Sequence, residues 1–391
     1  MLESPGSVPG SMRQRGGKGK VRKRLTLVLG VLALAALAAA CAPNATQDAM
    51  NPQGPYARES YDLIVPVFWV AAAIFVLVEG VLLFVVFRYR RRKGRAAEVP
   101  PQIHGNNRLE IAWTILPALI LAGVAVPTVT TIFDLAEEPT GQVLEVNVLG
   151  HQWWWEFDYP NEGIITANEL HIPTGEPVYL TLCSVGLGYG QQPTPNDCQP
   201  GPPEGQAPAA VGDGVIHSFW VPELAGTQDV VPGRTNTLTL QADHPGRYSG
   251  QCKEFCGLSH AYMKFVVVAH TPADYAAWVA NQQADAVTPQ AGSLAATGMD
   301  VFLNGQCIAC HAIQGLEDAN GNPLQANGGP SLTHFASREC FAGCIFHSAD
   351  PKQLAAWLEN PPAMKAGSWM PDYGLSQEQI QALVAYLQSL T

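Results

Sequence analysis

Two long apolar stretches constrain the fold of this chain more than any other feature. They are Ile64–Phe87 and Ile111–Phe133, and each is long enough to cross the hydrocarbon core of a bilayer as one α-helix. The segment between them begins with the basic run Arg88–Lys93, and short basic loops stay on the cytoplasmic side. Residues 62–134 are therefore predicted to form a transmembrane α-helical hairpin whose two outer ends lie outside the cytoplasm.

The amino terminus has the layout of an export signal. Basic residues within 13–24 precede the apolar run Leu25–Ala40, which ends in small residues directly before Cys41. That run is too short to span a membrane comfortably. Cys41 resembles the lipidated cysteine of a bacterial lipoprotein signal; ordinary cleavage nearby and an uncleaved anchor helix are the alternatives. We expect residues 1–41 to be a signal peptide and the protein to reside in a bacterial plasma membrane.

Two carboxylates fall within the predicted hairpin. Glu79 lies inside the first span, so its side chain must face protein rather than lipid. Glu110 lies where the second span begins. A carboxylate at that place can stabilise the helix amino terminus through the helix dipole. The same position also suits a proton entrance from the cytoplasm, and the residues alone leave both interpretations open.

Charge and cysteine usage narrow the class of protein. The chain carries 22 Lys and Arg against 33 Asp and Glu, and acidic residues dominate after Asp134. This balance argues against nucleic acid as a partner and suits an extracytoplasmic domain that meets basic or redox-protein partners. The 9 cysteines are too scattered for a single disulfide framework, which indicates several separate chemistries.

Residues 143–270 have the pattern of an exported β domain. Short β-rich runs separated by Gly and Pro predict an antiparallel sandwich or barrel; they are Val143–Leu149, Val178–Cys183, Thr237–Ala242 and Lys264–Ala269. Cys183 and Cys198 flank the insertion 184–214, which is rich in Gly and Pro. A disulfide between them is predicted in an oxidising compartment, and two free thiols are the alternative.

Three consecutive tryptophans, Trp153–Trp155, stand near the start of this domain. Aromatic clusters are usually part of a core. Side chains alternate between the two faces of a strand, however, so three adjacent rings cannot all point to one side. At least one ring is expected near the surface, where it would be a candidate for docking and electron input.

The segment 252–263 holds two thiols, an imidazole, a thioether and a carboxylate, and a lone histidine lies upstream. Soft thiolate and thioether ligands beside imidazole favour copper. A single copper ion would leave one thiol unexplained, whereas two thiolates four residues apart can bridge two ions. The predicted ligands are His217, Cys252, the main-chain oxygen of Glu254, Cys256, His260 and Met263. A disulfide between the two cysteines and a structural zinc site are the alternatives.

These residues carry a family resemblance. The pattern Cys-x-Glu-x-Cys-Gly-x-x-His-x-x-Met, preceded by Val-Ile-His-Ser-Phe-Trp-Val-Pro, resembles subunit II of the haem–copper cytochrome c oxidases. The resemblance runs from Asp62 to about Ala269. It implies an all-β cupredoxin Greek-key barrel that holds a binuclear copper A centre. It also implies that the Glu254 side chain reaches a magnesium ion shared with subunit I.

The resemblance assigns two further residues. Trp153 matches the electron-input tryptophan of the family, and Glu110, in Leu-Glu-Ile-Ala-Trp-Thr, matches the carboxylate at a proton-channel entrance. One departure is evident. Many members have Asp three residues before the first copper histidine, where this chain has Gly214 with Asp213 one residue earlier. The role of that Asp is therefore not carried over.

The carboxy-terminal part predicts a second redox unit. After a linker at 271–292 with some helical character, Cys307, Cys310 and His311 form the Cys-x-x-Cys-His signature of covalently bound haem c. A thioredoxin-like thiol pair is the alternative. A methionine as sixth iron ligand raises the potential of such sites. Met370, in Trp-Met-Pro, resembles the ligand of cytochrome c domains and is preferred to Met364.

Other features of residues 293–391 fit an all-α cytochrome c domain. Helical periodicity appears at Pro351–Glu359 and Ser376–Leu390, the second opening on a capping box. The segment Gly329–Leu332 resembles the one whose proline carbonyl orients the iron-binding histidine. Cys340 and Cys344 are extra to the family pattern. They are expected to form a local disulfide, and a metal site with His334 and His347 is the alternative.

The resemblance implies the electron-input subunit of a cytochrome c oxidase, a proton-translocating enzyme that reduces oxygen to water. Electrons would pass from haem c through copper A to subunit I, because this chain has no oxygen site of its own. Subunit I, subunit III, membrane lipid and a donor cytochrome c or upstream complex are the expected partners. A membrane-anchored carrier that serves another reductase is the alternative. A quinol-oxidase subunit would lack the copper ligands, and a copper-delivery protein would not explain the haem.

Overall fold

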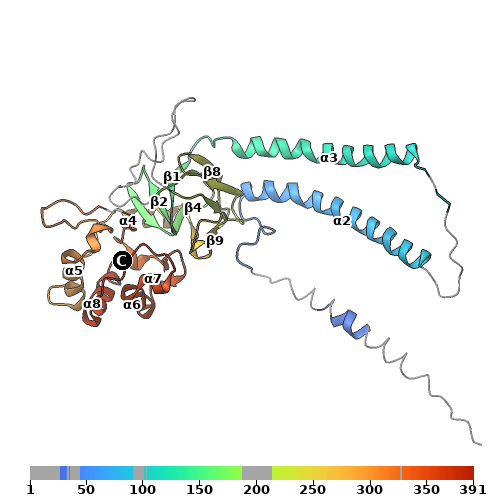
Figure 1. Ribbon diagram of the computed structural model, residues 1–391. Helices are drawn as coiled ribbons and strands as arrows, with labels where there is room; N and C mark the ends of the chain where they lie inside the picture. The colour runs from blue at the N-terminus through green and yellow to red at the C-terminus, as the bar shows by residue number, and fades with distance from the viewer. Residues whose placement is uncertain are drawn as a thin grey trace, which may run out of the picture. The chain divides into compact units, whose positions relative to one another are not determined.

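The computed structural model describes residues 27–32, 35, 45–90, 101–102, 104–186, 214–325 and 328–391. The chain divides into a unit at Met1–Thr46, which contains a helical stretch at 27–32, and a second unit at Gln47–Thr391. The second unit contains two long helices, a β domain and a carboxy-terminal helical domain (Figure 1). Four predictions lie wholly or mostly outside the described residues: the signal at 1–41, lipidation of Cys41, the bridge to Cys198 and the place of Asp213.

Two helices correspond to the predicted spans. They are α2 (Pro55–Tyr89) and α3 (Asn107–Ala136), and both are long and apolar enough to cross a membrane. Most of their side chains are exposed in the isolated chain, Glu79 included, as expected for surfaces that meet lipid or a partner subunit.

The start of α3 is capped by a reciprocal pair. The side chain of Asn106 accepts hydrogen bonds from the backbone N–H groups of Arg108 and Leu109, while the Glu110 carboxylate accepts one from the N–H of Asn106 at 3.2 Å. These bonds satisfy donors that a helix terminus leaves without partners. Glu110 therefore has a local structural role in addition to the proton-channel role expected for it.

The β domain consists of two five-stranded sheets with the orders β3-β2-β1-β5-β8 and β4-β10-β9-β6-β7. The strands are β1 (Leu144–His151), β2 (Trp154–Tyr159), β3 (Ile164–Ala167), β4 (Glu169–Pro173), β5 (Val178–Ser184), β6 (His217–Trp220), β7 (Thr227–Val230), β8 (Asn236–Leu240), β9 (Gly246–Cys252) and β10 (Lys264–His270). The expected all-β arrangement is confirmed. Most strand pairs are antiparallel, as expected, but β1 pairs with β5 and β4 pairs with β10 in parallel.

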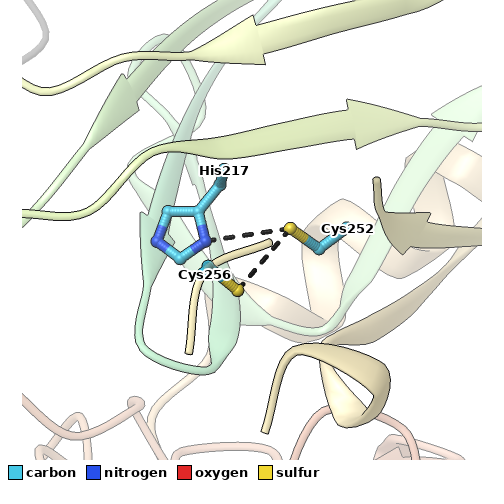
Figure 2. A group of neighbouring side chains, drawn as sticks. All are labelled: His217, Cys252 and Cys256. Atoms are coloured by element: carbon cyan, nitrogen blue, oxygen red, sulfur yellow. Dashed lines mark hydrogen bonds between the residues drawn. The ribbon is translucent and has the colours of Figure 1, made fainter. Parts of the chain in front are cut away.

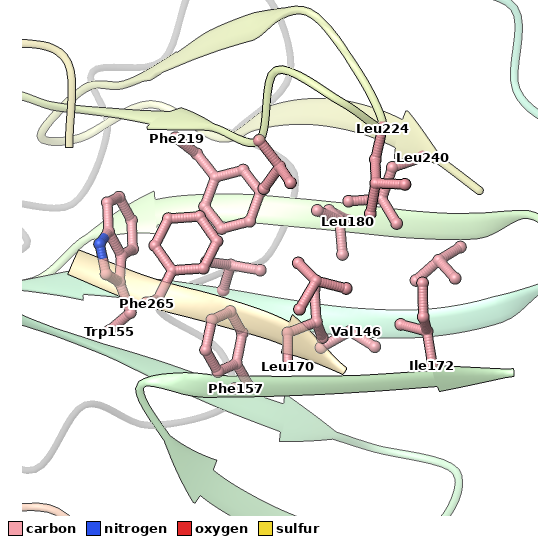
Figure 3. Close-up of a cluster of buried hydrophobic side chains, with 14 of the residues drawn as sticks. Val146, Trp155, Phe157, Leu170, Ile172, Leu180, Phe219, Leu224, Leu240 and Phe265 are labelled. Atoms are coloured by element: carbon pink, nitrogen blue, oxygen red, sulfur yellow. The ribbon is translucent and has the colours of Figure 1, made fainter. Parts of the chain in front are cut away.

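The core of the β domain lies between the two sheets (Figure 3). Trp155 and Phe157 from β2 point inward against Phe219 of β6 and Phe265 of β10. The rings of Phe219 and Phe265 stack with their centroids 4.4 Å apart, and Trp155 meets Phe219 edge to face at 5.4 Å. Such buried aromatic contacts supply a large share of the apolar burial that holds two sheets together. They make a rigid base for the loops at this end of the barrel.

The segment expected as a linker is largely ordered. Helix α4 (Pro272–Gln282) begins at Thr271, whose hydroxyl accepts the N–H of Asp274. Trp278 of α4 stacks on the ring of His171 in β4, with centroids 4.4 Å apart. A tryptophan that packs on the barrel explains why this stretch is a docked helix rather than a free tether.

The carboxy-terminal domain is mostly helical. Its helices are α5 (Leu294–Asn304), α6 (Pro351–Glu359), α7 (Pro361–Met364) and α8 (Gln377–Leu387), with a two-residue ladder of β11 (Cys340–Phe341) and β12 (Phe346–His347). The bounds of α6 agree with the predicted helix. The capping box that opens α8 is also confirmed, between Ser376 and Gln379.

Helices α5 and α8 pack closely because of Gly298. A Cβ at this position would collide with the carbonyl oxygen of Ala382 and lie 2.7 Å from the Cβ of Tyr386. Both obstacles belong to the α8 backbone or its first side-chain atom, so neither can rotate away. The glycine is thus required by the helix crossing and not by the backbone angles of α5.

We predict that Gly298→Ala destabilises this domain by about 1–3 kcal/mol, as overpacking does in a close-packed core. In an exposed helix the same change would stabilise by about 0.5–1 kcal/mol, so the sign of the effect is diagnostic. Thermal unfolding followed at the haem absorption band measures it. Thr297→Ala, at the exposed neighbouring position, is the matched control and should leave the midpoint nearly unchanged. A raised midpoint for Gly298→Ala would contradict the proposed crossing.

Candidate copper and haem sites

Two thiols and an imidazole meet at one end of the β domain (Figure 2). Cys252 ends β9, Cys256 lies on the loop that follows, and His217 begins β6. The two Sγ atoms are 3.8 Å apart, and Nδ1 of His217 is 3.9 Å from Sγ of Cys252. All three side chains are buried, and both cysteines are free thiols. The structure therefore does not contain the disulfide that the sequence left open.

The other predicted ligands surround the same thiols. Sγ of Cys256 lies 3.5 Å from Nδ1 of His260 and 3.9 Å from the sulfur of Met263. The main-chain oxygen of Glu254 is 3.2 Å from Sγ of Cys252, while the Glu254 side chain is exposed. Two thiols, two imidazoles, a thioether and a carbonyl oxygen form a compact soft donor set that fits copper.

The two thiols influence each other's protonation. The hydrogen bond between them lowers the pKa of Cys252 to about 4, outweighing burial, which acts in the opposite direction. The same hydrogen bond and burial raise the pKa of Cys256. The pair therefore loses one proton readily and holds the other. Since thiolates are the ligating form, binding of cations would have to displace that second proton.

We predict that Cys256→Ser abolishes binuclear copper binding, because it removes the sulfur nearest to both His260 and Met263. Copper per chain should fall from about two to one or none, since a soft metal strongly prefers thiolate over hydroxyl. Metal analysis and electron paramagnetic resonance of the purified protein measure the loss. The haem content of the same sample is the internal control for folding. A variant that retains both ions would refute the bridging assignment.

The second site follows helix α5. Cys307 and Cys310 are free thiols on and beside a short 3₁₀ turn at Cys307–Ala309, and His311 comes next. Nδ1 of His311 lies 2.8 Å from the carbonyl oxygen of Pro330, which confirms the contact expected from the Gly-Pro-Ser-Leu segment. Desolvation lowers the pKa of His311 and keeps the imidazole neutral, the form that binds iron.

A cavity of about 560 Å³ opens beside these residues. Its wall includes both thiols, His311 and Met370, but not Met364. Apolar side chains form much of the remainder, among them Phe302, Leu354, Trp357, Leu383 and Leu387. A large apolar cavity with two thiols, an imidazole and a thioether on its wall fits a covalently attached haem.

Two methionine variants separate the candidate iron ligands. Met370→Ala should remove the methionine-ligation absorption band and lower the haem potential, because a thioether ligand raises it. Met364→Ala is the matched control, since Met364 is partly buried like Met370 but lies outside the cavity wall. Its spectrum and potential should match those of the unmodified protein. Spectroelectrochemical titration measures both quantities, and the reverse pattern would reassign the ligand to Met364.

The two extra cysteines of the helical domain, Cys340 and Cys344, form a disulfide. The metal-site alternative for them is not supported. Both ring nitrogens of His334 lie near carbonyl oxygens, Nδ1 at 3.0 Å from Thr391 and Nε2 at 3.1 Å from Ala284. Both ring nitrogens are therefore occupied by contacts with the carboxy terminus and with the residues that follow α4. The Cys340–Cys344 loop instead lies against the β domain, through a contact of Cys340 with Glu169.

The tryptophans are placed differently from the simplest expectation. Trp153 is only 7% exposed, and its indole N–H donates to the carbonyl oxygen of Cys256 at 2.9 Å. Trp154 is partly exposed and Trp155 belongs to the core. Trp153 thus contacts the loop at 253–263, which we call the copper loop, but its ring is buried rather than exposed to solvent. The cover includes Gly367 of the helical domain, where a Cβ would lie 2.6 Å from the indole ring.

Sequence reasoning did not find two charged residues between the domains. Lys365 is 4% exposed, and its ammonium donates to the carbonyl oxygens of Trp153 and Ala342. Glu169 is 1% exposed, and its carboxylate accepts the N–H groups of Glu339 and Cys340. Neither lies in a motif. A lysine in a loop and a glutamate in a strand are unremarkable in sequence until their partners, far away in the chain, are known.

Comparisons with known proteins agree with this geometry. Residues 43–131 match the family model for the transmembrane domain of cytochrome c oxidase subunit II, residues 208–270 match its periplasmic domain, and residues 295–391 match cytochrome c. "Cytochrome c oxidase subunit 2" of Alkalihalophilus pseudofirmus is 37% identical over 88% of this chain and 90% of its own length. The protein of that name from Bacillus sp. PS3 is 35% identical over 77% of this chain and 80% of its own length. "Quinol oxidase subunit 2" of Bacillus cereus is 34% identical, over 60% and 72%.

Proposed function

Because the chain belongs to the cytochrome c oxidase subunit II family and carries a cytochrome c domain, we propose that it is the electron-input subunit of a terminal oxidase. Covalent haem c at Cys307 and Cys310 and a copper pair at Cys252 and Cys256, when bound, supply the one-electron carriers. Electrons would leave for subunit I, where oxygen is reduced to water and protons are pumped. The protein residues hold the two sites and orient them toward each other.

One observation supports electron transfer between the two sites within this chain. Trp153 lies on the wall of the haem cavity, and its indole N–H is bonded to the carbonyl oxygen of Cys256. A single side chain therefore contacts both the cavity and the copper loop. This supports Trp153 as the point where an electron passes between the domains. An electron donor, either a cytochrome c or an upstream respiratory complex, would then deliver electrons to the carboxy-terminal helical domain, residues 293–391, which we call the haem domain.

The copper loop also presents a surface suited to subunit I. Phe255 and Leu258 are 73% and 77% exposed, and the Glu254 side chain beside them is exposed as well. Exposed apolar side chains around a charged group are typical of a protein interface. We assign Glu254 there to a shared magnesium ion. On the hairpin, Glu79 would face a partner subunit, I or III, and Glu110 would stand at a proton-channel entrance.

The hairpin anchors both redox domains at the extracytoplasmic face, and the signal at 1–41 suits a bacterial plasma membrane. The alternative is a membrane-anchored carrier for another reductase, which would have the same two sites but no oxidase partner. A quinol-oxidase role is less well supported, although some relatives bear that name. A quinol oxidase subunit would not need the soft donors that meet at His217, Cys252 and Cys256.

Purification from native membranes in mild detergent tests the proposal. We expect co-purification with a large haem-containing subunit, a mixed-valence dicopper signal, and oxygen uptake that starts when the haem of this chain is reduced. Removal of copper by a chelator should stop oxygen uptake while leaving haem c reducible. Purification with no oxidase partner would favour the carrier alternative. A single-copper spectrum would exclude the proposed centre.

A further inference from the structure

A six-residue segment of the helical domain, Lys365–Met370, links the haem cavity to the copper loop. Met370 at its end lines the cavity. The first three residues, Lys365, Ala366 and Gly367, each contact the β domain. Contacts to the β domain and the wall of the haem cavity therefore lie within six residues of one another.

The first contact is a buried ammonium group. Nζ of Lys365 donates to the carbonyl oxygen of Trp153 at 2.5 Å and to that of Ala342 at 2.8 Å. Burial of a charge is costly unless hydrogen bonds compensate for it. Desolvation lowers the pKa of Lys365 to about 7. This buried lysine therefore connects the backbone of Trp153 to the loop closed by the Cys340–Cys344 disulfide.

Each of the other two contacts involves a residue that is next to, or hydrogen-bonded to, a predicted copper ligand. Ser259, which precedes His260, donates its hydroxyl to the carbonyl oxygen of Ala366 at 2.5 Å. Gly367 has φ +79° and lies directly over the Trp153 ring, with no room for a Cβ. The left-handed backbone and the missing side chain together permit this close approach.

We propose that Lys365–Gly367 is a docking element that fixes the haem domain against the copper loop, with Lys365 as its positioning residue. The inference rests on the proposed transfer of electrons between the two sites and identifies what sets their separation. A fixed intramolecular contact replaces the diffusional encounter of two separate proteins. It also covers Trp153, so an external donor would not contact this tryptophan directly.

A second anchor holds the domains together independently of this element. The Glu169 carboxylate accepts the N–H groups of Glu339 at 2.7 Å and Cys340 at 3.1 Å. Arg247 of β9 also forms an ion pair with Glu339. A change within Lys365–Gly367 should therefore displace the haem domain locally without releasing it.

The test substitutes Gly367→Ala in the purified full-length protein with both cofactors bound. The new methyl group must push the haem domain away from Trp153. Electron transfer slows as the distance between donor and acceptor grows. We expect transfer from haem to copper, after rapid photoreduction of the haem, to be slowed about threefold or more, because the placement of a reacting pair controls its rate. Reduction of the haem by ascorbate with a soluble mediator, the haem spectrum and the copper signal should be unchanged.

The matched control is Gly321→Ala. Gly321 has nearly the same backbone angle, φ +78°, but its Cβ would meet only a Glu317 oxygen at 3.8 Å. It should transfer electrons within twofold of the unmodified protein. A rate for Gly367→Ala equal to that of the control, with both spectra intact, would overturn the docking element. Absence of transfer in the unmodified protein would instead reject the proposed function.

A second variant covers the case in which Gly367→Ala does not retain haem. Lys365→Met keeps the buried aliphatic chain and removes the donor to Trp153 and Ala342. The same slowing of about threefold or more is expected, with the midpoint potentials of haem and copper unchanged, because the substitution alters only the placement of the two sites. An unaltered transfer rate would refute the role of Lys365. A shifted potential that accounts for the whole slowing would also refute it.

Discussion

The hydrogen bond from the Trp153 indole to the Cys256 carbonyl oxygen is the contact on which the arrangement of the two sites depends. The side chain of Trp153 is joined to the copper loop, and its own carbonyl oxygen accepts the Lys365 ammonium of the haem domain. One residue is thereby bonded to both domains at once. The ring cannot turn without loss of a buried hydrogen bond, and the haem domain cannot slide without exposing a buried charge.

The scaffold beneath the copper loop explains how the thiols are held. Residue pairing between β6 and β9 places Phe219 opposite Cys252, so the strand that begins with His217 runs beside the strand that ends with the first thiol. The stacked rings of Phe219 and Phe265 fill the core directly behind. Because close-packed cores resist displacement, this packing limits how far the sulfur and nitrogen atoms can move apart. The loop at 253–263 then supplies the remaining donors.

Two opposite charges are buried where the domains meet. Burial would raise the pKa of Glu169, but hydrogen bonds from His171, Glu339 and Cys340 outweigh it and lower the pKa, so the carboxylate stays ionised. Burial lowers the pKa of Lys365 to about 7, against a smaller opposing interaction with Cys256, and its Nζ donates to two carbonyl oxygens. Buried charges of this kind add little net stability, yet a wrong docking geometry would leave them without partners. They therefore favour one position of the haem domain over others.

Much of the chemistry could be predicted from the sequence because it depends on local spacing. Cys252 to Met263 lie within one loop, and Cys307 to His311 within one turn, so the distances between residues along the chain already limit which donors can meet. The two spans and the capping box at Ser376 are likewise local. Strand pairing was less predictable, since alternating residues do not reveal whether β1 has β5 as a parallel neighbour.

By itself, then, the sequence determined the candidate donors at each site, the membrane hairpin and the family resemblance. Only the tertiary structure decided that Trp153 is covered and that Met370 rather than Met364 faces the cavity. It alone showed that Lys365 is buried against a backbone 212 residues away along the chain. The reason is physical: ligand spacing is a short-range property, whereas burial and docking depend on which distant segments pack together.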